Sequence, residues 1–120
     1  MKMSEYQKLS ERTMPKWDNN VSLWYWNRME KSNYALGLNG EAGEVGEIVK
    51  KHIHHHHPYT DETEMKLKKE IGDVLHYLAG LCTMYNIQLE ECATLNLMKL
   101  EERYPNEFNK EDSLMRKDEE

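Results

Sequence analysis

The chain has 120 residues, of which 38% are hydrophobic and 32% are charged, and its formal net charge is −6 at pH 7. This length suits one domain with a modest core, and the hydrophobic content argues against a disordered chain. The acidic balance argues against a nucleic-acid partner, because the surface has no overall attraction for a phosphate backbone.

The sequence also indicates a compartment. No apolar run approaches the roughly 20 residues that span a bilayer, and the first ten residues lack a signal-peptide core. Cys82 and Cys92 fall in apolar helical patterns without the spacing of a disulfide framework, so we expect buried thiols. These features predict a cytoplasmic protein that makes no membrane contact.

The N-terminal third predicts one short helix and an aromatic cluster. We expect an amphipathic helix over residues 4–14, which Pro15 ends. Residues 16–33 show no clear period. Large aromatic side chains usually serve packing, so we assign theirs to the core or a subunit contact, with a base-stacking platform as the alternative. They are Trp17, Trp24, Tyr25 and Trp26.

A long helix is expected over residues 32–51, where Leu36, Val45 and Val49 recur at helical spacing. Four glycines recur every three residues within it. They are Gly37, Gly40, Gly43 and Gly46. Because each glycine costs about 1 kcal/mol of helix propensity relative to alanine, we expect another helix or a ligand to approach this face closely.

Residues 52–59 are expected to connect this helix to the next, and they include four consecutive histidines, residues 54–57. Neutral imidazoles bind zinc or nickel, which gives this run a metal-binding interpretation. Consecutive residues cannot all converge on one ion as helix-spaced residues can, so we favour a solvated loop.

Two further helices complete the predicted fold. One begins after a cap at Thr60 or Asp61 and reaches about Tyr85, and the other spans roughly residues 89–103. Short connections favour antiparallel neighbours. The sequence therefore predicts an all-α, antiparallel bundle of four to five helices, completed by association into an oligomer.

Two pairs of acidic residues stand out. Glu41 and Glu44 are three residues apart, and so are Glu70 and Asp73, which places each pair on one helix face about a turn apart. Pro58 lies fourteen residues after Glu44 and twelve before Glu70. In an antiparallel hairpin the two pairs would therefore sit at nearly the same height.

Such an arrangement of like charges favours a bound cation. Small or apolar residues flank each pair, and oxygen ligands of this kind suit a hard divalent ion such as magnesium with retained waters. The alternative is that these acids lie on solvated helix faces. Glu47 has three interpretations: a further ligand, a general base or an exposed side chain.

Three ordered blocks of the sequence resemble the MazG-like nucleoside triphosphate pyrophosphohydrolases, an all-α family with an ExxE pair followed by an ExxD pair. The blocks are residues 36–45 with Lys50 and Lys51, residues 70–75 with 77–79, and residues 96–105. The resemblance runs from about residue 6 to residue 108. It sets one domain at residues 1–108 and leaves 109–120 as a charged, flexible tail.

The resemblance implies roles for particular residues. The magnesium ligands and catalytic acids would be Glu41, Glu44, Glu70 and Asp73, with manganese as a substitute ion. The substrate-binding residues would be Asn96, Lys99, Arg103 and Lys51. The implied reaction is hydrolysis of a nucleoside or deoxynucleoside triphosphate to the monophosphate and pyrophosphate, in house-cleaning of the nucleotide pool. A homodimer or homotetramer is implied as well.

Two other functions compete with this one. Asp73 and His76 have the acid and histidine spacing of di-iron bundles, but such sites ordinarily use two Glu-x-x-His motifs and the sequence holds one degenerate copy. A non-catalytic helical interaction module would keep the fold without turnover. The presence of all four acids argues against that module.

Overall fold

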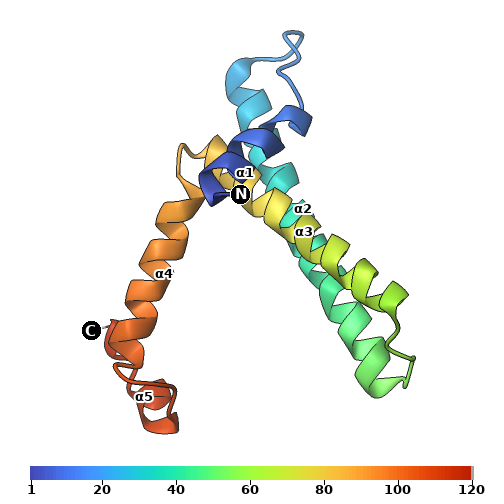
Figure 1. The fold of residues 1–120 in the computed structure, drawn as a ribbon. Helices are drawn as coiled ribbons and strands as arrows, with labels where there is room; N and C mark the ends of the chain where they lie inside the picture. Colours follow the sequence, from blue (N-terminus) through green and yellow to red (C-terminus); the bar gives the residue numbers. More distant parts are fainter. Residues whose placement is uncertain (120) are drawn as a thin grey trace.

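The computed structural model describes residues 1–119, and within that range it consists of helices, turns and loops without a strand (Figure 1). The α-helices are α1 (Met3–Ser10), α2 (Leu23–His54), α3 (Asp61–Met84), α4 (Leu89–Arg103) and α5 (Lys110–Met115). Short 3₁₀ helices are η1 (Glu11–Thr13) and η2 (Lys117–Glu119). The all-α prediction is confirmed. None of the helices among these residues is long and apolar enough to cross a membrane.

The helix ends follow local capping chemistry. Thr60 caps α3 by accepting a hydrogen bond from the Thr63 amide at 3.3 Å, which decides between the two caps expected from the sequence, Thr60 and Asp61. Helix α2 begins at Leu23 rather than near Ser32, because Ser22 accepts the Tyr25 amide and starts the helix before the aromatic run. The first helix ends at Ser10, so the expected span to residue 14 was too long and its last part is η1.

Helices α2 and α3 form an antiparallel hairpin, α1 lies across one end of it, and α4 turns away from the hairpin like the second arm of an inverted V (Figure 1). The radius of gyration is 18.1 Å. A compact domain of this length would have about 14 Å. A single chain therefore leaves much of its apolar surface without a partner.

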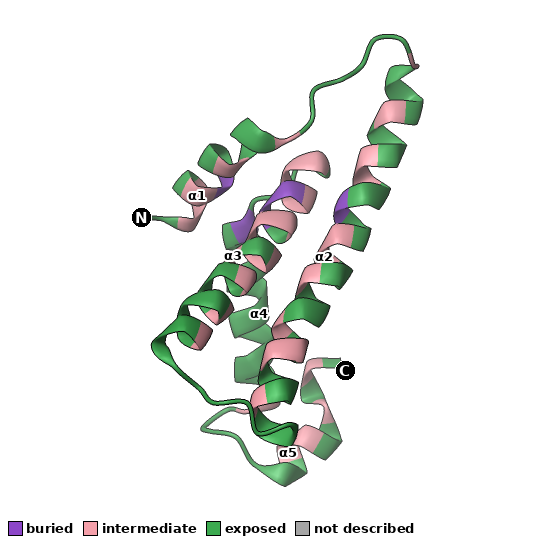
Figure 2. Cartoon of the chain, turned by 90° about the vertical axis from the view of Figure 1, so that its right-hand side faces the viewer, coloured by how far each residue is buried: buried purple, intermediate pink, exposed green. Residues whose placement is uncertain are grey.

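The core lies where α1, α2, α3 and the start of α4 meet (Figure 2). The buried residues within the described range are Gln7, Tyr34, Ala79, Gly80 and Leu89. A methyl group at Gly80 would overlap the Tyr34 ring, so this glycine allows α2 and α3 to approach each other.

The glycines of α2 differ from one another. Gly37 faces the Tyr77 ring, which confirms the expected close approach at that position. At Gly40, Gly43 and Gly46 an added Cβ would have no described atom within 4 Å, so the expected approach of another helix is not found there within the chain.

One polar side chain joins α1 to the elbow between α3 and α4. Gln7 is 5% exposed and donates to the Ile87 carbonyl at 2.8 Å and to Thr83 Oγ1 at 3.2 Å. Its Oε1 accepts the Leu89 amide at 2.8 Å. Because the buried amide is fully engaged, it fixes the direction in which α4 begins.

Candidate active site

Three of the four predicted acids converge between α2 and α3. One carboxylate oxygen each from Glu41, Glu70 and Asp73 lies within 4.8 Å of the other two. Glu41 comes from α2, whereas Glu70 and Asp73 are one turn apart on α3. The antiparallel hairpin therefore brings the two acid pairs to the same level, as the spacing around Pro58 predicted.

Burial and acidic neighbours both act on Glu41. Its pKa is raised chiefly by burial, then by a hydrogen bond with Glu70, and then by the negative charges of Asp73, Glu70 and Glu44. Among residues 1–119 no lysine or arginine forms an ion pair with any of these four acids. The cluster thus carries uncompensated negative charge, which a cation would neutralise.

The remaining acids of α2 are placed differently. Glu44 is exposed and lies outside the group of three, although its charge still acts on Glu41. Glu47 faces Lys50 and Lys51, with oxygen to nitrogen distances of 3.9 Å to each. Of the three interpretations of Glu47, its lysine contacts and its 44% exposed side chain favour the third, an exposed side chain.

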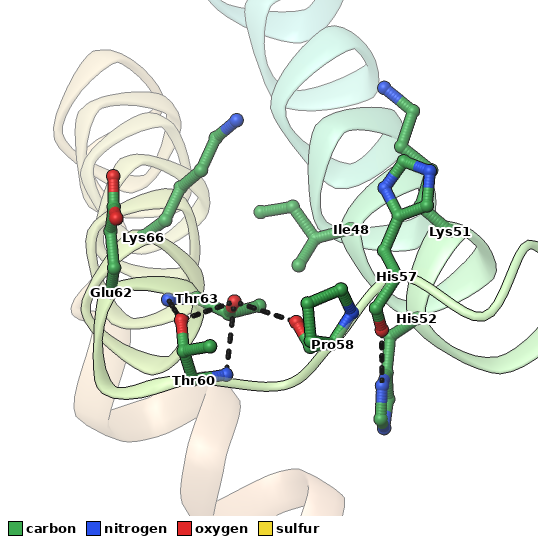
Figure 3. Close-up of a pocket in the computed structure, with 9 residues that line it drawn as sticks. All are labelled: Ile48, Lys51, His52, His57, Pro58, Thr60, Glu62, Thr63 and Lys66. Atoms are coloured by element: carbon green, nitrogen blue, oxygen red, sulfur yellow. Dashed lines mark hydrogen bonds between the residues drawn. The ribbon is translucent and has the colours of Figure 1, made fainter.

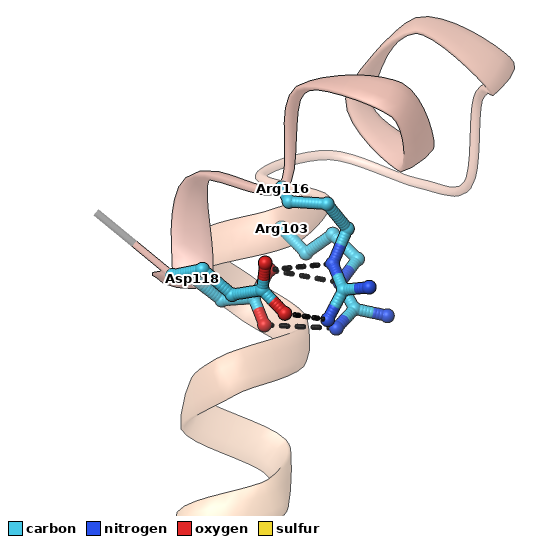
Figure 4. Close-up of polar contacts among 4 residues, drawn as sticks. Arg103, Arg116 and Asp118 are labelled. Atoms are coloured by element: carbon cyan, nitrogen blue, oxygen red, sulfur yellow. Dashed lines mark hydrogen bonds and ion pairs between the residues drawn. The ribbon is translucent and has the colours of Figure 1, made fainter.

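The predicted phosphate-binding residues of α4 are not brought to the acids of their own chain, because α4 points away from that part of the hairpin (Figure 1). Asn96 and Lys99 are exposed. The Arg103 guanidinium instead donates to both carboxylate oxygens of Asp118, at 2.9 and 2.8 Å (Figure 4). This bidentate contact lowers the pKa of Asp118 far below its usual range and raises that of Arg103.

Sequence reasoning missed Asp118. It lies in η2, fifteen positions beyond Arg103, in a tail whose charges carry no pattern that would single it out. Arg116 also approaches this carboxylate, at 3.5 Å. The segment that the sequence set aside as a flexible tail therefore includes α5 and a residue that contacts a predicted substrate ligand.

Lys51 lines a cavity of about 390 Å³ at the connection between α2 and α3 (Figure 3). The cavity is also lined by Ile48, His52, His57, Pro58, Thr60, Glu62, Thr63 and Lys66. Lys66 is one turn before Glu70 on α3 and is the second lysine that lines this cavity; sequence reasoning did not single it out.

The histidines do not join the acid cluster. His54 ends α2, and the next three form the connection to α3; no histidine of the described chain joins a cluster able to hold a metal. His76 packs its ring 5.8 Å from that of Tyr34 and 5.3 Å from that of Tyr77. It therefore has aromatic neighbours and does not join the acid group. A di-iron site would need a histidine ligand in that group.

The predicted aromatic cluster is divided. Trp17 and Trp24 are exposed, Trp26 is half-buried, and Arg28 lies 4.8 Å above the Trp24 ring. The cluster thus contributes little to the core of one chain.

Comparison with known proteins places this site in a family. Residues 29–108, which are 80 of the 120, match the family model of the MazG nucleotide pyrophosphohydrolase domain, and that range includes both acid pairs. The Gene 37 protein of Mycobacterium phage L5 is 37% identical over 73 residues, which are 60% of this chain and 64% of the phage protein. No solved structure matches the chain. On the extent of the domain match, the chain belongs to the MazG nucleotide pyrophosphohydrolase domain family.

Proposed function

We propose that the protein is a magnesium-dependent hydrolase that converts a nucleoside or deoxynucleoside triphosphate to the monophosphate and pyrophosphate, in house-cleaning of the nucleotide pool. The observation that carries the proposal is the convergence of Glu41, Glu70 and Asp73 within the matched domain. An interaction module without turnover would have no use for three acids held against their mutual repulsion.

The donor set fits the proposed ion. Magnesium prefers oxygen ligands and retains waters, so a few carboxylates on one side suit it better than they suit zinc or copper. The pKa of Glu41 is raised chiefly by burial, and the negative charges of its acidic neighbours add to this effect; a divalent cation would relieve that repulsion. Manganese has similar ligand preferences, and we expect it to substitute. When bound, the ion would neutralise phosphate charge and stabilise the transition state.

The acidic residues would then bind the ion and supply the general base. Glu41, Glu44, Glu70 and Asp73 would hold the ion, and a carboxylate of this cluster would accept the proton of the water that attacks the α-phosphorus. Pyrophosphate leaves in line with the attack. No covalent nucleophile is required.

Fixed cations would bind the phosphates. Lys51 is on the same hairpin as the acids, whereas Asn96, Lys99 and Arg103 follow one face of α4. For Arg103 to grip a phosphate, its fork must exchange the Asp118 carboxylate for phosphate oxygens, which have similar geometry.

We also propose that the enzyme is a homodimer, or a homotetramer built from such dimers. Helix α4 has apolar residues on two opposite sides, Leu97 with Leu100 and Leu95 with Met98, and all four are at least 40% exposed. A helix that is apolar on two sides is typical of one packed between neighbours. A second copy would cover α4 and bring its polar face towards the acids of the first.

The test is product analysis over a panel of ribo- and deoxyribonucleoside triphosphates, with magnesium, manganese, or a chelator. We expect at least one substrate to give equal amounts of monophosphate and pyrophosphate, only when the metal is present. Glu70→Gln should abolish most of this turnover. Its matched control is Glu64→Gln on the same helix, since Glu64 pairs with Lys68 and not with the cluster.

Three results would contradict the proposal. Release of inorganic phosphate in place of pyrophosphate would identify a different bond as the target. A complete lack of turnover over the panel would favour the interaction module, and a coloured protein that binds iron would favour the redox bundle.

A further inference from the structure

The elbow between α3 and α4 holds the two cysteines of the chain next to each other. Cys82 lies in the last turn of α3, Cys92 lies in the first turns of α4, and their Sγ atoms are 3.9 Å apart. The expectation of two buried thiols is wrong for Cys92, which is exposed, while Cys82 is half-buried. We propose that Cys82 and Cys92 form a reversible intrachain disulfide that locks this elbow.

The geometry requires little movement. A disulfide needs its sulfurs about 2.05 Å apart, so each Sγ must approach by roughly 1 Å, a distance within the range of side-chain rotation. The elbow already places the two sulfurs near each other before any bond forms.

The elbow is braced independently of the sulfurs. The Ile87 amide donates to the Cys82 carbonyl at 2.7 Å, and Asn86 turns the chain with a φ of 56°. Gln7 holds Ile87 and Leu89 from the other side. Because these contacts fix the backbone on both sides of the turn, the two thiols stay close instead of meeting only by chance.

The two thiols would react in order of access. The exposed Cys92 thiolate attacks one sulfur of a small disulfide such as oxidised glutathione, forms a mixed disulfide and releases one glutathione thiolate. Cys82 then attacks Cys92 Sγ and releases the second glutathione. In total, two protein thiols and one oxidised glutathione give one protein disulfide and two reduced glutathione molecules.

The environment of Cys82 makes it the second thiol to react. Burial raises the pKa of Cys82, and its contact with Cys92 raises it further, so its thiolate form is disfavoured and it does not begin the exchange. Once Cys92 is in a mixed disulfide, Cys82 is next to the sulfur that it must attack.

The disulfide would cross-link α3 to α4 and so fix the angle at which α4 leaves the α2–α3 hairpin. The inference does not depend on the proposed hydrolase activity, since it concerns only the thiols and the elbow.

The experiment titrates the full-length protein with mixtures of oxidised and reduced glutathione and counts thiols by alkylation and intact mass. We expect the number of free thiols per chain to fall from two to zero, with a mass loss of about 2 Da and no attached glutathione. Glu90 and Glu91 lie between the cysteines. Cleavage there should leave two fragments that only a reductant separates. The oxidised form should melt roughly 5 °C or more above the reduced form.

Cys82→Ser and Cys92→Ser are the matched controls, and neither should show a rise in melting temperature. Cys82→Ser should carry one glutathione on the exposed Cys92, whereas Cys92→Ser should react more slowly because Cys82 is half-buried. A parent protein that carries two glutathiones, or a disulfide between chains, would overturn the intrachain bond. If the intrachain bond forms without any rise in melting temperature, the proposal that it locks the elbow is wrong.

Discussion

The α2–α3 hairpin and the α4 arm differ in how much of their structure one chain supplies. The hairpin has close helix contacts within one chain, with Gly80 against Tyr34 and Gly37 against Tyr77, and it assembles three acids. In the arm, every residue from 90 to 102 is exposed. The difference suggests that the metal side of the proposed site is preorganised within a chain, while the phosphate side depends on association.

The largest expected effect tests that division directly. Glu70→Gln and Lys99→Ala should each lose most activity, the first through metal affinity and the second through a KM raised about 10-fold or more. If the arm serves the acids of a partner, mixing the two inactive variants should restore roughly a quarter of parental activity, because mixed dimers contain one intact site.

Steady-state kinetics after mixing and subunit exchange provide the measurement, and unmixed variants provide the baseline. An arm that serves its own chain would give no recovery, because every site would then carry one defect. Unchanged kinetics in Lys99→Ala would show that the phosphates are bound elsewhere.

The next effect concerns assembly. Leu97 is 64% exposed in a single chain. Leu97→Glu should convert the dimer to a monomer, because association would remove the new carboxylate from water. Light scattering at micromolar concentration measures the mass. The control is Leu114→Glu, since Leu114 on α5 is 85% exposed and outside the arm. A parent chain that is already monomeric would refute the proposed oligomer.

A smaller effect compares two glycines of the hairpin. Gly80→Ala should destabilise the fold by about 1–3 kcal/mol, because the new methyl group overlaps the Tyr34 ring. Gly46→Ala should stabilise it by about 0.5–1 kcal/mol, because that position has open space and alanine favours a helix. Urea unfolding measures both. Destabilisation by Gly46→Ala would mean that a partner surface packs there in solution.

The smallest effect lies at the end of the arm. Asp118→Asn should lower the melting temperature at neutral pH by removing the carboxylate that holds Arg103. The pKa of Asp118 is lower in the folded chain than its unfolded value of about 3.9. The ion pair with Arg103 therefore stabilises the fold fully at a pH well above the unfolded pKa of Asp118. This stabilisation is lost as the pH falls through the folded pKa.

Melting curves of the parent and Asp118→Asn should accordingly converge as the pH falls below about 4. Glu111→Gln serves as the control, because it removes one exposed charge from α5 that forms no ion pair within residues 1–119. A constant difference between parent and variant across this pH range would exclude the ion pair as the cause.

The predictable features are those with local causes. The span of α4 and the Thr60 cap of α3 follow from periodicity and capping, and the level of the acid pairs follows from counting residues on either side of Pro58. The start of α2 was missed because its aromatic run has no helical period, although Ser22 is a good cap. Local chemistry thus predicted most helices and the centre of the site.

The features that sequence reasoning missed depend on contacts between distant segments. Nothing near Arg103 indicates that Asp118 binds it, and nothing near Cys82 indicates that Cys92 lies within 3.9 Å. The direction of the arm is also set at a distance, by Gln7. A sequence period shows which face of a helix is apolar, but not which neighbour covers it.

The Gln7 contact has a consequence for synthesis of the chain. Its partners Thr83, Ile87 and Leu89 follow it by 76 to 82 positions. A ribosome adds about 5–20 residues per second, so α1 waits several seconds for the elbow that satisfies its buried amide. The hairpin can close in the meantime from contacts between neighbouring segments. Helix α1 is therefore made well before the elbow against which it docks, and docking it completes the elbow from which α4 departs.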